Sequence, residues 1–558
     1  MKVPAHFHVT LAVVLALLLP CAVNTFAQGT GDNAIRLIVE QMRQAPEARI
    51  RGARLLQTAA VAKFLEARGF TPVWKIPGDA SNLLKAIRAI EEDGLTPDDY
   101  HLATLTAALD AHAKAATPQL AAELQVLMAD AAAAMIDHVR YGRVRPATLD
   151  KRWNVDPRVG APALEITLDQ LARSGSIDAG IDALKPNHFI YTGLKQALAR
   201  MRAVAKAGGW PTVTAGPSLK PGAKDPRVVA IRKRLAATGE LAKDASLDDP
   251  AYAADLEAAV KNFQAHHRLT DDGVIGRGTI DALNVSAETR ASQLRVNLER
   301  ARWVVGGLRD SFVLVNLPAF KAYIIRDRKN VWETRTQIGR EARKTPTFRA
   351  DMKYLVLNPD WTVPPTILAQ DVLGGMKKGQ NTIAKKKLTI LDDRGRPVDP
   401  STIDWQAATP RTFRYTLRQL PGADNALGRV KFIFPNEYSI FLHDTPSQEL
   451  FAADQRTFSS GCIRVANALD LARVLLAGQK TRPDGWNAEK IESTIASGHS
   501  QTVFFEEPLP VLIVYWTASI GAGGDLRFAK DVYALDPPVL RALNAPIGED
   551  HAKRAIHP

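Results

Sequence analysis

Apolar residues recur at helical spacing through much of the stretch from residue 30 to about 215. The clearest runs are residues 61–65 and residues 121–139 (AAELQVLMADAAAAMIDHV). This period predicts amphipathic helices, and the Gly and Pro residues near 94–97 and 142–146 predict loops between them. No acid–base pair, metal-ligand spacing or Gly-rich phosphate loop stands out in this region. The pattern therefore predicts a helical scaffold domain over residues 28–217.

A more compact helical pattern follows a Pro- and Gly-rich boundary near residues 208–222. Short helices are predicted at residues 228–235, 256–266 and 279–283. A unit of about 65 residues lies near the lower limit for independent folding, so residues 218–290 are predicted to form a binding module rather than an enzyme. His266 and His267 are adjacent and point in different directions on a helix, and no third ligand is suitably spaced. We therefore predict no metal site there.

The hydrophobic period changes from helical to β at about residue 312. Runs of β-branched and aromatic residues, bounded by turn residues, occur at 312–317, 322–325, 354–357, 430–434, 438–442 and 511–516. Such frequent strands predict a β-sandwich or a closed sheet. We expect a mainly-β, sandwich-like domain over residues 295–530 and a C-terminal tail over 531–558. The whole chain is then a multidomain α+β protein.

A basic insertion interrupts the predicted strands at about residues 367–427. It contains Lys377, Lys378 and the lysine run 385–387. A long insertion in a sheet domain is typical of a lid or a binding loop. We expect a lid, whose basic residues help to hold an acidic ligand.

The N-terminus predicts export. Lys2 precedes an apolar stretch over residues 9–22, and small residues follow up to Ala27. A stretch of about 14 residues is typical of a signal peptide and too short for a membrane span; an uncleaved anchor helix is the alternative. No later run approaches membrane-spanning length. We expect a signal peptide over residues 1–27, cleavage after Ala27 and a periplasmic protein without a transmembrane segment.

Charge and composition narrow the choice of partner. The chain has 72 Lys and Arg against 59 Asp and Glu, a formal net charge of +13. Such a surplus favours an anionic partner. Export argues against nucleic acid and in favour of the carboxylate-rich cell wall. The hydrophobic fraction of 46% excludes global disorder.

Cysteine usage points to one residue. Of the two cysteines, Cys21 lies in the predicted signal peptide, which leaves Cys462 without an internal disulfide partner. A lone Cys is usually a small buried hydrophobe. Its surroundings indicate another role here, because a predicted strand ends at His443 and a second begins around Cys462.

A Cys–His pair supports nucleophilic catalysis. The imidazole of His443 can take the thiol proton of Cys462, or hold a thiolate beside an imidazolium, and can later protonate a leaving amine. The N–H groups of Gly461 and Cys462 are candidate oxyanion donors. Arg464 either organises the loop, with Ser460 beside it, or pairs with a substrate carboxylate. Asp444 is expected to point away, so a backbone carbonyl is expected to orient His443.

The longer string is more specific than the pair. Residues 443–446 (HDTP) together with residues 459–465 (SSGCIRV) resemble the active-site signature of YkuD-type L,D-transpeptidases, and in particular a large Gram-negative subgroup. The resemblance covers nearly the whole mature chain: a helical scaffold, a peptidoglycan-binding module with the turn 272–276 (DGVIG), and a catalytic domain with a capping lid. Phe441 departs from the expected Tyr two residues before the His.

The resemblance implies a function and a site. The substrates would be peptidoglycan stem peptides as donor and acceptor: Cys462 would form a thioester with release of D-Ala, and a diaminopimelate amine would then complete a 3-3 cross-link. Carbapenems would acylate the same thiol, and periplasmic wall-synthesis proteins would be partners. Trp361 and Phe441 are candidate pocket walls, with core packing as the alternative for each. No metal or other cofactor is required, because a nucleophile, a base and oxyanion donors suffice.

Other functions remain open from the sequence. With water as acceptor the same thioester gives an L,D-carboxypeptidase, and with a lipoprotein lysine it gives a lipoprotein-to-peptidoglycan ligase. A noncatalytic wall-binding scaffold protein is the alternative from another class. A papain-like peptidase is disfavoured, because there the Cys precedes the His along the chain.

Overall fold

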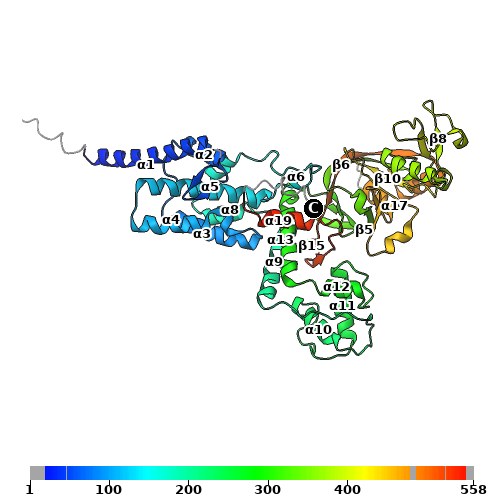
Figure 1. The fold of residues 1–558 in the computed structure, drawn as a ribbon, viewed down its shortest axis with the longest axis horizontal. Coiled ribbons are helices and arrows are strands. Elements are labelled where there is room, and N and C mark those ends of the chain that lie inside the picture. Colours follow the sequence, from blue (N-terminus) through cyan, green and yellow to red (C-terminus); the bar gives the residue numbers. More distant parts are fainter. Residues whose placement is uncertain (1–18, 46, 478–484, 522, 548–558) are drawn as a thin grey trace, which may run out of the picture. The chain divides into compact units, whose positions relative to one another are not determined.

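The computed structural model describes residues 19–45, 47–477, 485–521 and 523–547 (Figure 1). The chain divides into two compact units. The first contains the described residues up to Arg145, residues 157–195 and those after Leu540; the second contains Pro146–Asp156 and Gln196–Leu540. The predicted signal peptide lies mostly outside the described residues. Helix α1 (Leu19–Gln44) begins inside it and continues past the expected cleavage site at Ala27.

The first unit is helical, with one short hairpin. Its elements are α2 (Thr58–Ala67), α3 (Gly78–Ala89), α4 (Leu102–Lys114), α5 (Pro118–Tyr141), α7 (Leu164–Arg173), α8 (Ile177–Ala183), the start of α9 (Phe189–Lys206), β1 (Arg49–Ile50) and β2 (Ala53–Arg54). The central helix is α5, on which Leu124, Met128 and Met135 are fully buried.

The apolar character of α5 reflects this central position. Among the described residues, it is the one helix long and apolar enough by length and composition to cross a membrane, but 83% of its most apolar window is buried inside the protein. Asp130 is also fully buried on α5. Its carboxylate accepts hydrogen bonds from the backbone amides of Leu56 and Gln57 and contacts His101 Nε2 at 2.7 Å. These partners compensate for the burial of a charged group.

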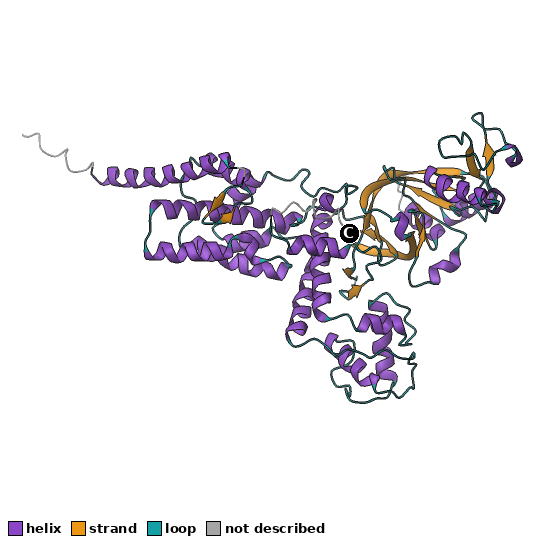
Figure 2. Cartoon of the chain, in the orientation of Figure 1, coloured by secondary structure: helices purple, strands orange, loops and turns teal. Residues whose placement is uncertain are grey.

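The second unit is built around a curved sheet, whose strands are orange in Figure 2. Among its described residues, nine strands pair in the order β12-β5-β13-β11-β10-β6-β14-β3-β4, and β4 also pairs with β5. The sheet therefore closes on itself, which is the closed-sheet alternative of the sequence prediction. The strands are β3 (Phe312–Asn316), β4 (Lys321–Arg326), β5 (Lys329–Gly339), β6 (Phe348–Leu357), β10 (Val430–Ile433), β11 (Leu442–His443), β12 (Thr457–Ser459), β13 (Ile463–Val465) and β14 (Gln501–Val514).

Two strand predictions need correction. The run at residues 438–442 is mostly a turn: Ser439 has a φ of 53° and β11 begins only at Leu442. Strand β5 was not predicted, because its first half is polar and exposed (KNVWETR). The other predicted runs overlap β3, β4, β6, β10 and β14.

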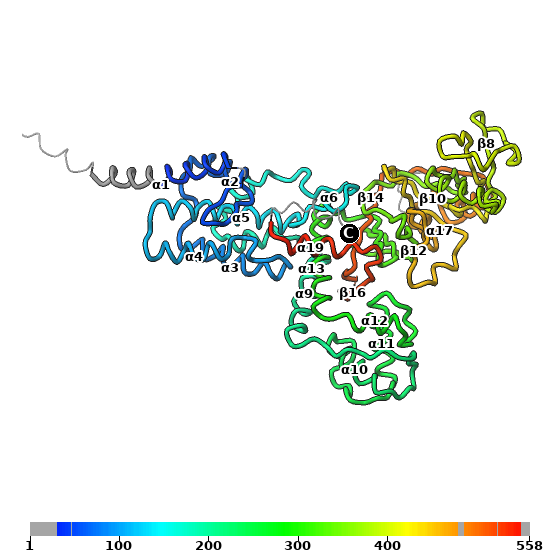
Figure 3. Tube along the Cα trace, in the orientation of Figure 1, coloured from blue at the N-terminus to red at the C-terminus, as the bar shows by residue number. Residues whose placement is uncertain are grey.

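The basic insertion folds as a small subdomain, and its path can be followed through β8 in Figure 3. Strands β7 (Trp361–Thr362), β9 (Thr416–Gln419) and β8 (Thr389–Leu391) pair in that order. Its helical segments are α14 (Pro365–Ile367), a π-helix (Leu368–Leu373), α15 (Gly374–Lys377) and α16 (Thr382–Lys385). A separate core holds these elements together, formed by Trp361, Val363, Val372, Ile383, Leu388, Ile390, Leu417 and Leu427.

The predicted three-helix module is present as α10 (Arg227–Thr238), α11 (Ala254–His266) and α12 (Arg277–Leu283), with its own apolar core. It packs on the hairpin β15 (Ala518–Ile520) and β16 (Leu526–Phe528). The imidazole of His267 stacks at 3.8 Å on the ring of Phe263 and at 5.5 Å on the ring of Phe528. Of the two adjacent histidines, His267 therefore serves in packing.

Five further α-helices are present among the described residues. They are α6 (Pro146–Leu149), α13 (Ala287–Val304), α17 (Ala468–Ala477), α18 (Ala488–Ser497) and α19 (Asp536–Asn544). The last of them lies in the segment predicted as a C-terminal tail. Buried Val539, Ala542 and Leu543 show that the described part of this segment is packed structure.

Candidate active site

The strands β11 and β13 bring the predicted catalytic residues to one face of the sheet. They are parallel neighbours in which Leu442 pairs with Ile463 and His443 with Arg464. Leu442 and Ile463 are fully buried in the core. Because side chains alternate along a strand, His443 and Arg464 lie on the opposite face. The backbone N–H of Ile463 donates to the carbonyl of Phe441, which sets Cys462 beside Phe441 on that same side.

His443 is held in one tautomer. Its Nδ1 lies at hydrogen-bond distance from the carbonyl oxygen of Asp444, which can only accept, so Nδ1 carries the proton. The other ring nitrogen, Nε2, is then the proton acceptor. The carboxylate of Asp444 points elsewhere and accepts from Arg429 N at 2.9 Å and from Gln448 Nε2 at 3.0 Å. Both predictions, orientation by a backbone carbonyl and an outward Asp444, are confirmed.

The surroundings of His443 keep its imidazole neutral. The residue is 5% exposed. Burial lowers its pKa to about 3, with further lowering by the charges of Arg464 and Lys431, against the opposing effect of the Asp444 carbonyl. At neutral pH the free Nε2 is therefore an unprotonated base.

Cys462 is partly accessible, and its thiol is bonded within the site. Its Sγ donates to the carbonyl of Ser439 at 3.7 Å. Burial by the surrounding atoms raises the pKa of the thiol, while the N–H of Phe441 and the charges of Lys431 and Arg464 oppose this rise. A neutral thiol beside a neutral imidazole is the resting state that these shifts favour.

The loop before Cys462 is fixed by several hydrogen bonds. Gly461 has a φ of 120°, a backbone conformation that favours glycine, and the carbonyl of Gly461 accepts from Thr345 Oγ1 at 2.7 Å. The N–H of Gly461 donates to Ser459 Oγ at 3.1 Å. This N–H is therefore already engaged, whereas no partner for the N–H of Cys462 is found among the described residues. Of the two predicted oxyanion donors, the Cys462 N–H is the available one.

The other predicted residues occupy different positions around this loop. Ser460 is exposed, and its Oγ accepts from Arg343 Nη1 at 2.7 Å. Arg464 Nη1 donates to Gln337 Oε1 at 3.1 Å, and Gln337 Nε2 donates to the carbonyl of Ser447. These bonds favour the structural role for Arg464, although its buried Nε has no hydrogen-bond partner among the described residues.

The two candidate pocket walls separate in the structure. Phe441 lies at the site, beside Cys462 and in contact with Lys431 Nζ, which is 4.2 Å from its ring centroid. Trp361 is 9% exposed and belongs to the core of the insertion. The structure thus places Phe441 beside Cys462 and uses Trp361 in the core of the insertion, the packing role that the sequence left open for it.

Sequence reasoning missed Lys431. It lies on β10 directly opposite His443 and faces the same side of the sheet. No hydrogen-bond or ion-pair partner for its Nζ is found in the part of the chain that the structure describes. Burial lowers its pKa, while the charges of Cys462 and Asp360 oppose that shift. The available signal was a single Lys inside an otherwise apolar strand, VKFIF.

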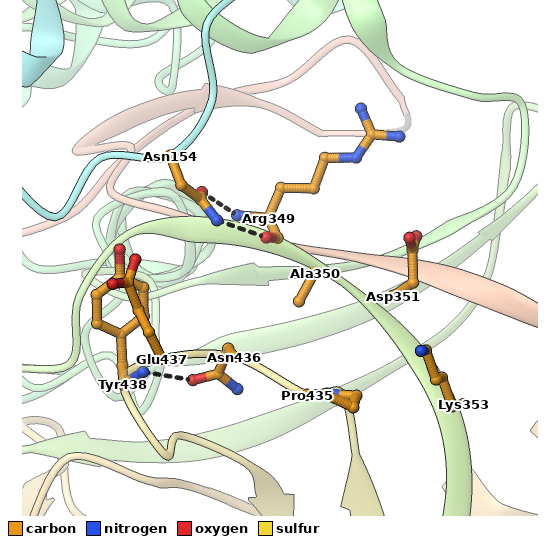
Figure 4. A pocket seen from close by; sticks show the side chains of 9 residues that line it. All are labelled: Asn154, Arg349, Ala350, Asp351, Lys353, Pro435, Asn436, Glu437 and Tyr438. Carbon is orange, nitrogen blue, oxygen red and sulfur yellow. Dashed lines mark hydrogen bonds between the residues drawn. The ribbon is translucent and has the colours of Figure 1, made fainter.

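The second unit also contains hollows whose lining residues do not include Cys462 or His443. Figure 4 shows one of about 330 Å³, lined by Asn154, Arg349, Ala350, Asp351, Lys353, Pro435, Asn436, Glu437 and Tyr438. Within it, the amide of Asn154 bonds both the N–H and the carbonyl of Arg349, at 3.0 and 2.9 Å. This hollow is where the segment Pro146–Asp156 attaches to β6. Among the described residues, no group of three His, Cys, Asp or Glu side chains could hold a metal ion.

Comparison with protein families identifies three regions. Residues 310–482 match the model of the L,D-transpeptidase catalytic domain, 224–283 that of a "Putative peptidoglycan binding domain" and 59–198 that of a scaffold domain. A curated Haemophilus influenzae protein named "Putative L,D-transpeptidase" is 33% identical over 273 residues. The match covers 48% of this chain and 54% of that protein, so it spans about half the length of the relative.

Solved structures give a weaker comparison. An L,D-transpeptidase from Xylanimonas cellulosilytica is 14% identical, with a TM-score of 0.17 over 54% of this chain and 99% of its own. One from Stackebrandtia nassauensis is 10% identical, with a TM-score of 0.20 over 55% and 96%. With TM-scores this low, the assignment depends on the family models and the curated relative. The chain therefore carries a region that matches the YkuD-type L,D-transpeptidase catalytic domain, together with regions that match a peptidoglycan-binding domain and a scaffold domain.

Proposed function

We propose that this protein uses Cys462 to join peptidoglycan stem peptides through 3-3 cross-links. The observation that carries the proposal is the arrangement of Cys462 and His443: a partly accessible thiol directly before β13, next to the strand β11 that holds a buried imidazole. The Nδ1 of this imidazole is bonded to a carbonyl, which leaves Nε2 as the proton acceptor. The peptidoglycan-binding domain supports the wall as substrate. The formal net charge of +13 suits a carboxylate-rich polymer.

In the first half-reaction the thiol replaces the leaving amine. Cys462 Sγ attacks the carbonyl that joins diaminopimelate to D-Ala while its proton passes to His443 Nε2. The N–H of Cys462 stabilises the oxyanion of the tetrahedral intermediate, an interaction worth about 2.7–4 kcal/mol. The C–N bond then breaks, His443 gives its proton to the amine of D-Ala, and a thioester remains on Cys462.

In the second half-reaction an acceptor amine replaces the sulfur. The side-chain amine of another diaminopimelate attacks the thioester and gives its proton to His443 Nε2. The C–S bond breaks, the proton returns to the sulfur, and the thiol of Cys462 is restored. A neutral His443 suits both halves, because it begins each as a base and ends each as an acid.

The proposal includes a place of action. We infer that residues 1–27 direct export and that the mature protein works in the periplasm, where the wall and periplasmic wall-synthesis proteins are its partners. The apolar stretch at residues 9–22 supports this. By the same chemistry, a carbapenem would acylate Cys462.

The test is mass spectrometry of muropeptides after incubation of the mature protein with tetrapeptide-rich sacculi. Dimers joined between two diaminopimelates are expected, and Cys462→Ala is expected to form none while still binding sacculi. Cys462→Ala with full cross-linking would refute the role of the nucleophile. Tripeptides alone would indicate water as the acceptor, and therefore a carboxypeptidase. Neither product from the wild type, with binding intact, would favour a noncatalytic wall-binding protein.

A further inference from the structure

Arg343 lies where the insertion meets the loop that carries Cys462. It ends a short 3-10 helix, Glu341–Arg343, that follows β5. Its side chain is only 7% exposed. An arginine buried to this extent requires acceptors for its N–H groups, and those acceptors come from two separate parts of the chain.

The first set of acceptors belongs to the π-helix of the insertion. Arg343 Nη1 and Nη2 each donate to one carboxylate oxygen of Asp371 at 2.8 Å, and Nε donates to Gln370 Oε1 at 2.9 Å. Partial burial raises the pKa of Asp371, but the hydrogen bonds and charges of Arg343 and Arg340 outweigh it and hold the pKa below its usual value. This forked pairing fixes the orientation of both groups. Short π-helical turns occur frequently at functional sites.

The second acceptor belongs to the catalytic loop. The same Nη1 donates to Ser460 Oγ at 2.7 Å, two residues before Cys462. The backbones are neighbours as well, since the carbonyl of Arg343 lies 3.9 Å, an ordinary van der Waals distance, from where a Cβ on Gly461 would stand. One nitrogen thus donates both to the insertion and to the loop.

Arg340 offers a natural comparison. Its Nη2 also donates to Asp371, at the longer distance of 3.4 Å. Its side chain is far more accessible than that of Arg343, 44% against 7%, and no bond joins it to Ser460. The side chain of Arg340 therefore shares the partner in the insertion but lacks the bond to Ser460. The link of Arg340 to the catalytic loop is its backbone N–H, which donates to the carbonyl of Ser459 at 3.0 Å and which Arg340→Gln keeps.

We propose that Arg343 is a positioning residue that couples the placement of the insertion to the conformation of the loop carrying Cys462. When Asp371 contacts Arg343, the two N–H groups of Nη1 donate to Asp371 and to Ser460. When the insertion moves away, Nη1 loses the carboxylate that fixes its position, and its bond to Ser460 is no longer supported. The coupling concerns the site of the proposed function. Its effect on turnover rests on that function, whereas its effect on the conformation of the loop does not.

Hydrogen exchange tests the coupling without any peptidoglycan. We expect Asp371→Asn to speed exchange of the amides of residues 460–462, which lie outside the insertion, by roughly 2- to 30-fold, the range typical of coupled sites. In an Arg343→Gln or a Ser460→Ala background, the same Asp371→Asn change is expected to alter exchange only within residues 368–373. Arg340→Gln is the matched control and is expected to leave residues 460–462 as in the wild type.

Two outcomes would overturn the proposal. In the first, Asp371→Asn speeds exchange only within the insertion. In the second, Arg340→Gln and Arg343→Gln change the exchange of residues 460–462 equally. If Arg343→Gln does not fold, the Asp371→Asn and Ser460→Ala pair gives the same comparison. Turnover of a tetrapeptide donor is the second readout, in which Arg343→Gln is expected to lower kcat more than it raises KM. Coupling in the exchange data without any turnover would leave the positioning role intact and contradict the proposed function instead.

Discussion

Lys431 on β10 pairs directly with His443 on β11, so an ammonium and an imidazole share the face of the sheet that carries Cys462. The positive charge lowers the pKa of both functional groups. It lowers the pKa of His443, after burial and Arg464, and it opposes the rise that burial causes in the pKa of Cys462. Lys431 thus favours both forms needed for attack, a neutral base and a thiolate.

Removal of this charge is expected to make the thiol harder to ionise. In Lys431→Met, the pH midpoint of Cys462 alkylation by iodoacetamide should rise, because a nearby cation favours the thiolate. Peptide mass spectrometry at Cys462 gives the rate at each pH. Lys431→Arg keeps the charge and is expected to stay near the wild-type midpoint. If Lys431→Met and Lys431→Arg shift the midpoint equally, the shape of the side chain at residue 431 matters, and not its charge.

Thr345 is expected to control both stability and rate. Its Oγ1 donates to the carbonyl of Gly461 and accepts from the N–H of Gly339 at 2.9 Å, and the residue is 3% exposed. Thr345→Val leaves both backbone groups buried without this partner, which costs about 1–3 kcal/mol. The loop shift should lower kcat by roughly 10- to 100-fold.

Thr345→Ser separates these effects from a change of shape, because it keeps the hydroxyl and loses only a methyl group. Thermal unfolding and donor turnover are measured on both variants. If Thr345→Ser and Thr345→Val lower the melting temperature and kcat equally, the methyl group, rather than the hydrogen bonds, supports the loop.

The sequence allowed prediction of the parts of the site that are encoded locally. The motif singles out His443 and Cys462 without any structure, and the strands predicted to end at the one and to begin around the other are the parallel neighbours β11 and β13. Lys431 escaped prediction, because a single Lys in a strand indicates a solvent-facing position equally well. Arg343 escaped for another reason: its partners Asp371 and Ser460 become neighbours only when the insertion folds against the sheet.

The same distinction applies to the fold. Helices α5, α10 and α11 follow from their apolar period, since each buries one face or more against its own unit. The first half of β5 has no such signal, because it is exposed and is held by pairing with β4. The insertion gave only a basic composition, while its core depends on contacts between its two ends, such as Trp361 and Leu427.

His267 is expected to make the protein less stable in acid. Burial lowers its pKa well below the usual value, with a further contribution from the charge of Arg290, while the carbonyl of Phe263 opposes the shift. Below about pH 6.5 the unfolded chain therefore binds a proton that the folded chain does not, and stability falls as the pH falls. His267→Phe lacks this loss of stability. The melting temperature of the variant minus that of the wild type should therefore increase as the pH falls from 7.5 to 5.5.

His266 supplies the matched control for this comparison. It is the neighbouring residue and is partly exposed, whereas His267 is 8% exposed between the rings of Phe263 and Phe528. His266→Phe is expected to keep the pH dependence of the wild type. The explanation fails if the two substitutions change that dependence equally.

The lysines of the insertion are expected to contribute to wall binding unequally. Lys385, Lys386 and Lys387 are all exposed, but Lys387 forms an ion pair with Asp424. A paired charge attracts an external anion less than a free one, so the effect should reside mainly in the other two. Reversal of both charges, in Lys385→Glu with Lys386→Glu, should weaken binding to sacculi by about tenfold at low ionic strength. The loss of affinity should shrink as salt screens the interaction.

The control for this prediction is Lys75→Glu with Lys114→Glu, which makes the same change of net charge at exposed positions of the first unit. If that pair weakens binding equally, the total charge of the protein attracts the wall, and not the insertion.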